Sequence, residues 1–316
     1  MSADSVLAPV APPVDTAAID RVVRLALEED APWGDVTSDA FVPVEAWATA
    51  ELVAREPGVF SGVGILVRTF AALETGVRVE PRRGDGERFE TGDVLAVITG
   101  PARAVLRGER VALNLVQRMS AIATTTARYV AEVAGTRARV VDTRKTTPGL
   151  RALERQAVRH GGGHNHRFSL SDAVMAKDNH LAVLAERGID VTSAIRDARA
   201  RIGHTVHLEV EVDRLEQIEP VIAGGVDTIM LDNFGVDELR EGVRIVAGRA
   251  LVEASGGVSL ATIGAIARTG VDVISVGALT HGVRALDLGL DIRSLGTRTR
   301  SRSRGDRDLG IRAGGS

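Results

Sequence analysis

The stretch RHGGGHNHR, from Arg159 to Arg167, places three histidines and two arginines within nine residues. An arginine guanidinium binds a carboxylate through two parallel hydrogen bonds. A pocket with several cationic groups is costly unless an anion occupies it. We therefore expect this segment to bind a planar anion with more than one charge, such as an aromatic dicarboxylate.

Two lysines also stand out, because Lys145 and Lys177 are the only lysines among 39 basic residues. Lysine carries a compact charge on a flexible stem, and burial readily shifts its pKa, whereas arginine is a rigid planar fork. Both lysines lie in polar segments that follow short apolar runs. We expect both lysines to take part in the chemistry. The alternative is that composition bias left these two lysines by chance.

Six short apolar runs in the second half of the chain alternate with helical patterns, which indicates βα units and a parallel sheet. The runs are ARVVDTRK, DAVMAKDN, HTVHLEVEV, VDTIMLDN, ALVEASGG and VDVISVGA. Each ends in polar or glycine-rich residues, and in a barrel of βα units this end carries the active site. About six units predict an incomplete or seven-stranded barrel.

Carboxylates follow the middle runs of this series. Strand alternation places Glu209 and Glu211 on one face, and Asp232 ends the next run. Such acids suit Mg²⁺, which typically takes one or two carboxylates together with water and phosphate. Ion pairing with the neighbouring basic residues is the alternative.

Glycines follow the last two runs. Ser255, Gly256 and Gly257 end one run and Gly277 ends the next, with His281 shortly after. Exposed backbone N–H groups at such turns bind phosphate. The predicted barrel mouth thus has an acidic side, a phosphate side and a basic side.

Composition limits the class of protein. The chain has 316 residues, of which 44% are hydrophobic, with a net charge of −3 and no cysteine. These values exclude disulfides and thiolate chemistry and predict a cytoplasmic enzyme without a membrane or nucleic-acid partner.

The chain divides into four parts in this interpretation. Residues 1–17 and the basic segment 293–316 are expected to be disordered tails. Residues 18–127 form a first domain that begins with a helix near Ile19, has strands at Trp47–Ala54 and VLAVITG, and contains most of a long helix over Arg103–Ala134. Residues 128–292 form the barrel.

The motifs together closely resemble the bacterial quinolinate phosphoribosyltransferases, also called carboxylating nicotinate-nucleotide pyrophosphorylases. They are ERVALN, DTRKTTPGLR, GGGHNHR, KDNH, EVEV, LDNF, EASGGV and VGALTH, in the order and spacing of that family. The resemblance implies an amino-terminal α/β sandwich domain, a seven-stranded α/β barrel and a homodimer with shared active sites.

The resemblance also implies a role for each candidate residue. Quinolinate would be bound by Arg144, His166, Arg167 and Lys177, with Arg110 from the neighbouring subunit. Phosphoribosyl pyrophosphate would be bound by Lys145, Ser255, Gly256, Gly257, Gly277 and His281. Glu211 and Asp232 would serve the ribose and Mg²⁺, and together with Lys145 and Lys177 they form the expected catalytic set.

The implied reaction transfers phosphoribosyl to quinolinate and releases pyrophosphate and CO₂, which yields nicotinate mononucleotide for NAD synthesis. Three alternatives remain at this stage. They are a lyase with a lysine Schiff base, a nucleic-acid binder acting through RTRSRSRGDR, and the paralogue associated with molybdenum transport genes.

Overall fold

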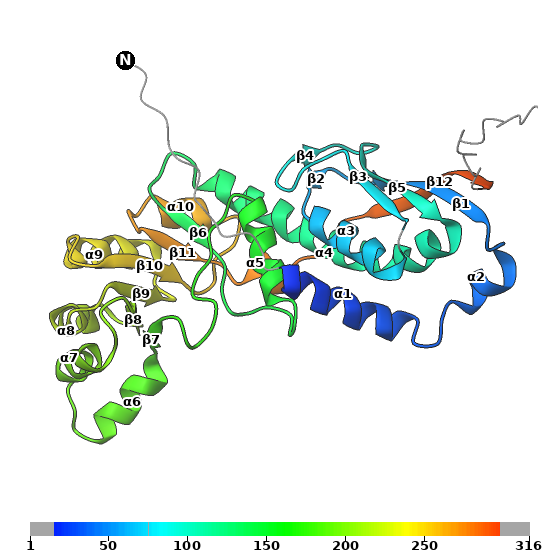
Figure 1. Cartoon of the computed structure of the whole chain (residues 1–316). Coiled ribbons are helices and arrows are strands. Elements are labelled where there is room, and N and C mark those ends of the chain that lie inside the picture. The colour runs from blue at the N-terminus through cyan, green and yellow to red at the C-terminus, as the bar shows by residue number, and fades with distance from the viewer. Residues whose placement is uncertain (1–15, 75, 298–316) are drawn as a thin grey trace, which may run out of the picture.

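The computed structural model describes residues 16–74 and 76–297 and contains two domains, one on each side of a long central helix (Figure 1). The first domain is built on an antiparallel sheet with the strand order β12-β1-β5-β3. Its elements are α1 (Thr16–Asp30), α2 (Val36–Phe41), β1 (Ala46–Ala54), β2 (Gly58–Val59), α3 (Val63–Leu73), β3 (Arg78–Pro81), β4 (Arg88–Phe89) and β5 (Val94–Pro101). The expected leading helix and the strands at 47–54 and 94–100 are all present.

The edge strand of this sheet corrects the expected domain boundaries. Strand β12 (Leu288–Thr297) returns from the barrel and pairs antiparallel with β1, from Ala54 opposite Leu288 to Ala46 opposite Thr297. Residues 288–297 therefore belong to the first domain's sheet, although we expected 288–292 in the barrel and 293–297 in a disordered tail. Strand pairing satisfies backbone groups that the local sequence pattern does not reveal. Thr16 and Ala17, which we expected in the first tail, instead begin helix α1. The remaining tail residues, 1–15 and 298–316, lie outside the described part of the chain.

The central helix α4 (Ala102–Glu132) agrees closely with the helix expected over 103–134. It crosses the expected domain boundary at residue 127 and packs against elements of both domains. Sixteen of its residues are buried, mostly small or aliphatic ones. This continuous apolar surface fixes how the two domains are placed relative to each other.

The second domain is an incomplete α/β barrel. Its parallel strands are β6 (Arg139–Val141), β7 (Val174–Ala176), β8 (Leu208–Val212), β9 (Thr228–Asp232), β10 (Leu251–Ser255) and β11 (Val273–Ser275). Their order is β6-β11-β10-β9-β8-β7, so the first strand pairs with the last, as in a barrel. All six expected strands are present.

The barrel is open between β6 and β7, and part of the histidine-rich segment lies on the open edge of β6. His164 forms an isolated parallel bridge with Val141, its amide donates to the carbonyl of Val140 at 2.8 Å, and its carbonyl accepts from Asp142. At the place where a seventh strand would pair with β6, His164 alone among the described residues forms a bridge.

Helices and one short turn connect the strands and cover the outside of the sheet (Figure 1). They are α5 (Arg151–His160), α6 (Asp178–Glu186), α7 (Val191–Arg201), η1 (Leu215–Gln217), α8 (Ile218–Gly224), α9 (Val236–Val246), α10 (Ile263–Ala267) and α11 (Ala278–His281). No helix among residues 16–74 and 76–297 is both long and apolar enough to cross a lipid bilayer.

Helix α5 ends against α4 at a glycine that cannot be replaced without movement. A Cβ atom on Gly161 would lie 2.4 Å from the carbonyl oxygen of Ala123 and 2.6 Å from Cβ of Thr126. Gly162, which follows, has a φ of +83°. The first glycine of the GGG run therefore permits close helix packing, and the second permits the left-handed turn.

Candidate active site

A cavity of about 670 Å³ lies at the carboxyl ends of the barrel strands. It brings together every candidate site residue from the sequence except Arg110 and Glu209. These residues are Arg144, Lys145, His166, Arg167, Lys177, Glu211, Asp232, Ser255, Gly256, Gly257, Gly277 and His281. Because they come from six strand ends that are far apart in the sequence, only the barrel geometry places them together.

The loop that carries Arg144 and Lys145 is supported from the central helix. Arg118 Nε donates to the fully buried Glu154 at 2.8 Å, and its Nη2 donates to Thr147 Oγ1 at 2.7 Å. The Thr280 hydroxyl donates to the carbonyl of Lys145 at 2.6 Å. Arg118 therefore supports the loop rather than forming part of a solvated helix face.

Lys177 and Glu211 form an ion pair across the cavity, with 2.5 Å between Nζ and Oε2. The lysine comes from the end of β7 and the glutamate from β8. The pair matches the alternative in which acids of the mouth pair with nearby bases. It also leaves the second oxygen of Glu211 available to a ligand.

Asp232 at the end of β9 is held by two donors. The Ser255 hydroxyl donates to Oδ1 at 2.5 Å, and the Asn233 side-chain amide donates to Oδ2 at 2.7 Å. These two donors fix the direction of the carboxylate. Glu211 and Asp232 both offer hard oxygen ligands to one cavity, which fits a Mg²⁺ ion that completes its coordination with water and substrate phosphate.

The glycine side of the cavity is formed by close contacts of the backbone. A Cβ atom on Gly256 would lie 2.1 Å from Asn233 Oδ1, whereas one on Gly257 would meet nothing within 4 Å. A Cβ on Gly277 would lie 3.1 Å from both His281 Nε2 and Lys145 Cδ. Gly257 therefore leaves open space beside the backbone.

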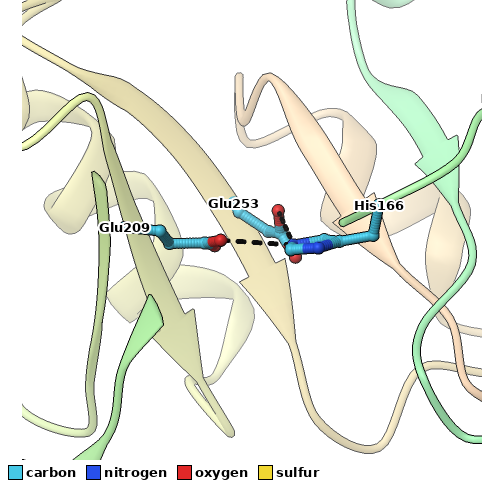
Figure 2. A group of neighbouring side chains, drawn as sticks. All are labelled: His166, Glu209 and Glu253. Atoms are coloured by element: carbon cyan, nitrogen blue, oxygen red, sulfur yellow. Dashed lines mark ion pairs between the residues drawn. The ribbon is translucent and has the colours of Figure 1, made fainter. Parts of the chain in front are cut away.

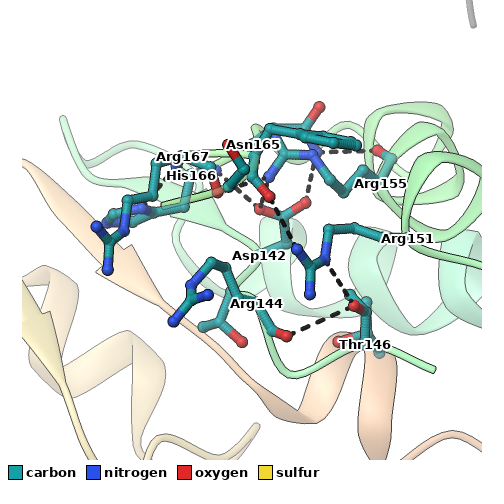
Figure 3. A network of polar contacts seen from close by, with 12 residues as sticks. Asp142, Arg144, Thr146, Arg151, Arg155, Asn165, His166 and Arg167 are labelled. Carbon is teal, nitrogen blue, oxygen red and sulfur yellow. Dashed lines mark hydrogen bonds and ion pairs between the residues drawn. The ribbon is translucent and has the colours of Figure 1, made fainter. Parts of the chain in front are cut away.

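The basic side depends on a buried aspartate (Figure 3). Asp142, which is fully buried, accepts from the backbone amide of His166 at 2.8 Å, from Asn165 Nδ2 at 2.6 Å and from Arg155 at 3.2 Å. Burial raises the pKa of Asp142, and the Arg155 charge and these hydrogen bonds oppose that shift. The network holds the segment that carries His166 and Arg167.

Arg167 lies close enough to Arg144 for their charges to interact. Burial, followed by the Arg144 charge, lowers the pKa of the Arg167 guanidinium. Arg167 Nη1 donates to the carbonyl of Ala173 at 3.0 Å. Two neighbouring guanidinium groups of this kind favour an anionic ligand.

His166 contacts two glutamates that line the barrel interior (Figure 2). Its Nε2 lies 3.2 Å from Glu209 Oε2 and 3.4 Å from Glu253 Oε2. Burial lowers the pKa of His166, but the hydrogen bonds and charges of both glutamates outweigh burial and raise the pKa to about 10. Burial and the Glu253 charge raise the pKa of Glu209.

The backbone amide of Arg167 donates to Nδ1 of His166 at 2.7 Å. This contact requires a lone pair on Nδ1, so it opposes the second ring proton that the two glutamates favour. The short distance fixes the orientation of the ring against the Arg167 backbone, with Nε2 directed at the two carboxylates.

Among the described residues, His166, Glu209 and Glu253 are also the one group of three whose ligand atoms are close enough to hold a metal ion. A histidine bound to metal through Nε2 normally donates its Nδ1 proton to a neighbour. Here Nδ1 accepts a hydrogen bond from the Arg167 amide instead. The surroundings of the ring therefore fit a hydrogen-bonded histidine better than a metal ligand.

The structure corrects our interpretation of the nine-residue segment. Only His166 and Arg167 line the strand-end cavity, while most of the segment, including Arg159, His160 and His164, lines a second cavity of about 790 Å³. Glu209 also lines this second cavity rather than the mouth, because it lies two residues before Glu211 and thus deeper in the barrel. The segment therefore contributes two residues to the anion clamp.

Sequence reasoning missed Glu253 and Asn233, which both line the strand-end cavity. A glutamate within the apolar run ALVEASGG is a detectable signal for Glu253, since an isolated acid in a buried strand needs a partner. Asn233 carries a positive φ of 62°, which no local sequence pattern indicates. Arg110 is exposed on α4 and does not line the cavity of its own chain.

Two family models together match most of the chain. The model described as "Quinolinate phosphoribosyl transferase, N-terminal domain" matches residues 35–120, and that described as "Quinolinate phosphoribosyl transferase, C-terminal domain" matches residues 122–291.

Curated relatives and solved structures agree with these matches. A nicotinate-nucleotide pyrophosphorylase [carboxylating] of Mycobacterium leprae is 45% identical over 276 residues, which cover 85% of this chain and 95% of the relative. A probable enzyme of the same name from Bacillus subtilis is 43% identical over 264 residues, covering 84% and 90%. The crystal structure of NadC from Streptococcus pyogenes superposes with a TM-score of 0.85 at 39% identity and covers 91% of this chain and 99% of that one.

Proposed function

Since the chain belongs to the quinolinate phosphoribosyltransferase family, we propose that its strand-end cavity binds quinolinate and phosphoribosyl pyrophosphate side by side. The enzyme is a pentosyltransferase of NAD biosynthesis. It transfers phosphoribosyl from phosphoribosyl pyrophosphate to quinolinate, with release of pyrophosphate and CO₂, and forms nicotinate mononucleotide.

One observation carries the assignment of the site to this reaction. A single cavity holds two arginines, both lysines of the chain, three carboxylates and a glycine-rich backbone. These groups match the charges of a dicarboxylate and of a diphosphate ester. A lyase that uses a lysine Schiff base would need neither the paired arginines nor the phosphate side.

Quinolinate is proposed to bind on the basic side. The guanidinium groups of Arg144 and Arg167 face the same space, and Lys177 supplies a further positive charge. Arginine forks bind carboxylates in a fixed plane, which would orient the pyridine nitrogen. His166 lines the same cavity beside this clamp.

Phosphoribosyl pyrophosphate is proposed to bind between Lys145 and the glycine side. The open space at Gly257 allows a phosphate to approach the backbone, while Gly277 and His281 lie next to Lys145. Glu211 and Asp232 would hold Mg²⁺ against the diphosphate. Bound there, the ion would neutralise charge on the departing pyrophosphate.

The chemistry then depends on positioning and charge. The lone pair of the pyridine nitrogen forms a bond to C1 of the ribose while the C–O bond to pyrophosphate breaks. Glu211 would favour the positive charge that develops on the ribose. The bond to the adjacent carboxylate then breaks, its electron pair stays on the ring carbon beside the cationic nitrogen, and that carbon takes up a proton as CO₂ leaves.

A homodimer is part of this proposal because Arg110 has no role in its own chain's cavity. Its exposed position on α4 suits a contact with a second copy. We propose that Arg110 of the partner subunit completes the quinolinate site. Mixing inactive Arg110→Ala with inactive Lys177→Ala protein should restore part of the activity, and no recovery despite exchange of subunits would contradict sharing.

The direct test is an assay with purified protein, quinolinate, phosphoribosyl pyrophosphate and Mg²⁺. We expect nicotinate mononucleotide and CO₂ in equal amounts, with loss of both products after addition of EDTA and recovery with excess Mg²⁺. Product formation that EDTA does not affect would contradict the metal proposal. A borohydride-stable adduct on Lys145 or Lys177 would favour the Schiff-base alternative. Because both substrates are highly charged and do not cross bilayers unaided, we place the enzyme in the cytoplasm.

A further inference from the structure

We propose that Glu209 and Glu253 are positioning residues of the quinolinate clamp, which hold the His166 ring so that its Nδ1 fixes the backbone of Arg167. In this arrangement His166 does not use a ring nitrogen to bind quinolinate. The inference rests on the proposed function, since it assumes that Arg167 binds a quinolinate carboxylate.

Both nitrogens of His166 have partners inside the protein. Nε2 lies between Glu209 Oε2 and Glu253 Oε2, at 3.2 and 3.4 Å. Nδ1 accepts from the Arg167 amide at 2.7 Å. To bind a substrate carboxylate, Nε2 would have to leave two buried carboxylates, and Nδ1 would have to lose its amide donor.

The glutamates make this arrangement directional. Each is 3% exposed, and within the described residues the Oε1 atom of each lacks a hydrogen-bond partner. Their Oε2 atoms both point at Nε2 (Figure 2). Two acceptors on one side of the ring hold Nε2 in place, and they thereby keep Nδ1 directed at the Arg167 amide.

Arg167 is thus held at both its backbone N–H and its backbone C=O. Its amide donates to His166, and its carbonyl accepts from Arg155 Nη1 at 3.2 Å. Its guanidinium is then anchored to the carbonyl of Ala173. A fixed backbone reduces the freedom that the arginine loses on binding a carboxylate, which strengthens binding.

Electrostatics alone predicts the opposite effect of the glutamates. Quinolinate carries two negative charges, and two buried carboxylates behind its binding site repel it. If repulsion were their whole effect, removal of the glutamates would tighten quinolinate binding. Weaker binding after their removal would therefore report positioning.

Two double variants separate these effects. The Glu209→Gln/Glu253→Gln protein loses both charges but keeps an acceptor at each position. The Glu209→Met/Glu253→Met protein loses both charges and both acceptors at similar side-chain size, and apolar replacement of buried charges often leaves stability intact. The two variants are equal in charge and differ only in their hydrogen bonding to His166.

The measurement is calorimetric titration of each protein with quinolinate and, separately, with phosphoribosyl pyrophosphate and Mg²⁺. We expect the Met variant to bind quinolinate about fivefold more weakly than the Gln variant, the size expected for net loss of a hydrogen bond between neutral groups. Binding of phosphoribosyl pyrophosphate should be equal in both. Equal or tighter quinolinate binding by the Met variant would overturn the proposal. Should the double Met variant not fold, the single pair Glu253→Met and Glu253→Gln gives the same comparison.

Substitution of the histidine provides a second test. His166→Asn places an oxygen near the position of Nδ1, where it can accept from the Arg167 amide, whereas His166→Gln places an amide donor near the position of Nε2. Positioning predicts that Asn retains more quinolinate affinity than Gln. Direct contact with the substrate predicts the reverse order, and that order would refute the inference.

Failure of the inference differs from failure of the proposed function. If wild-type protein binds no quinolinate and forms no product, the proposed function fails. If wild-type protein is active and the Met variant binds quinolinate as well as the Gln variant, only the positioning role fails.

Discussion

Gly256 and Gly257 offer a prediction in which one residue tests packing and the next tests substrate binding. Both have positive φ values, +84° and +59°, and follow strand β10. We consider Gly256→Ala and Gly257→Ala separately. The two changes add the same methyl group at adjacent positions but direct it to different surroundings.

The two variants share a backbone penalty and differ in steric cost. A left-handed conformation costs an alanine about 1–2 kcal/mol. The new methyl of Gly257→Ala meets nothing within 4 Å, so we expect that penalty alone. In Gly256→Ala the methyl would lie 2.1 Å from Asn233 Oδ1 and 2.8 Å from its backbone nitrogen.

Asn233 cannot yield easily at that point. Its amide donates to the carbonyl of Ser255 at 2.9 Å, and its side chain donates to Asp232. We therefore add an overpacking cost of about 1–3 kcal/mol for Gly256→Ala. The total is about 2–5 kcal/mol, roughly 1.5 to 4 times the loss in Gly257→Ala.

Urea unfolding and steady-state kinetics check both halves of this reasoning. Gly257→Ala should remain folded but show a KM for phosphoribosyl pyrophosphate raised by about tenfold or more, because the methyl occupies the space proposed for a phosphate. Its KM for quinolinate should change little. A wild-type KM for phosphoribosyl pyrophosphate in Gly257→Ala would refute the phosphate assignment, and equal stability of the two variants would refute the packing argument.

Two further predictions concern charge. Lys145→Arg and Lys177→Arg conserve charge but replace a point charge with a planar fork, and Lys177→Arg also disturbs the ion pair with Glu211. We therefore expect kcat/KM to fall by about 100-fold in each variant. Near-normal turnover in both variants would contradict a specific role for lysine. Burial lowers the pKa of His164, so the unfolded chain binds a proton at this histidine at higher pH than the folded protein does. The free energy of unfolding therefore falls as the pH drops from about 7 to about 5. In urea titrations His164→Gln should lose less stability over this interval than wild type, and identical losses would exclude the contribution of His164.

Local patterns in the sequence predicted much of the fold. The alternation of apolar runs with helical stretches identified the six barrel strands, because a buried parallel strand needs a short continuous apolar segment. The polar ends of those runs identified Lys145, Lys177, Glu211 and Asp232 as one set, because parallel strands present their carboxyl ends at the same side. These inferences depend only on periodicity and on the chemistry of side chains.

Other features depend on contacts between distant segments. Strand β12 joins the first domain because its backbone pairs with β1, about 240 residues earlier, and its own sequence carries no sign of that partner. Glu209 and Glu211 share a strand face, yet only Glu211 reaches the mouth, because inward residues of a barrel lie in successive layers.

The histidine-rich segment shows the same division between sequence and tertiary structure. Its residue types alone indicate an anion-binding role, which the sequence determines because arginine and histidine carry the necessary donors. Which of its histidines reaches the cavity depends on the bridge of His164 with β6 and on the burial of Asp142 beneath the His166 amide. The sequence thus determined the chemistry that is available, and tertiary structure decided which groups meet, because distances between side chains are set by packing across the whole barrel.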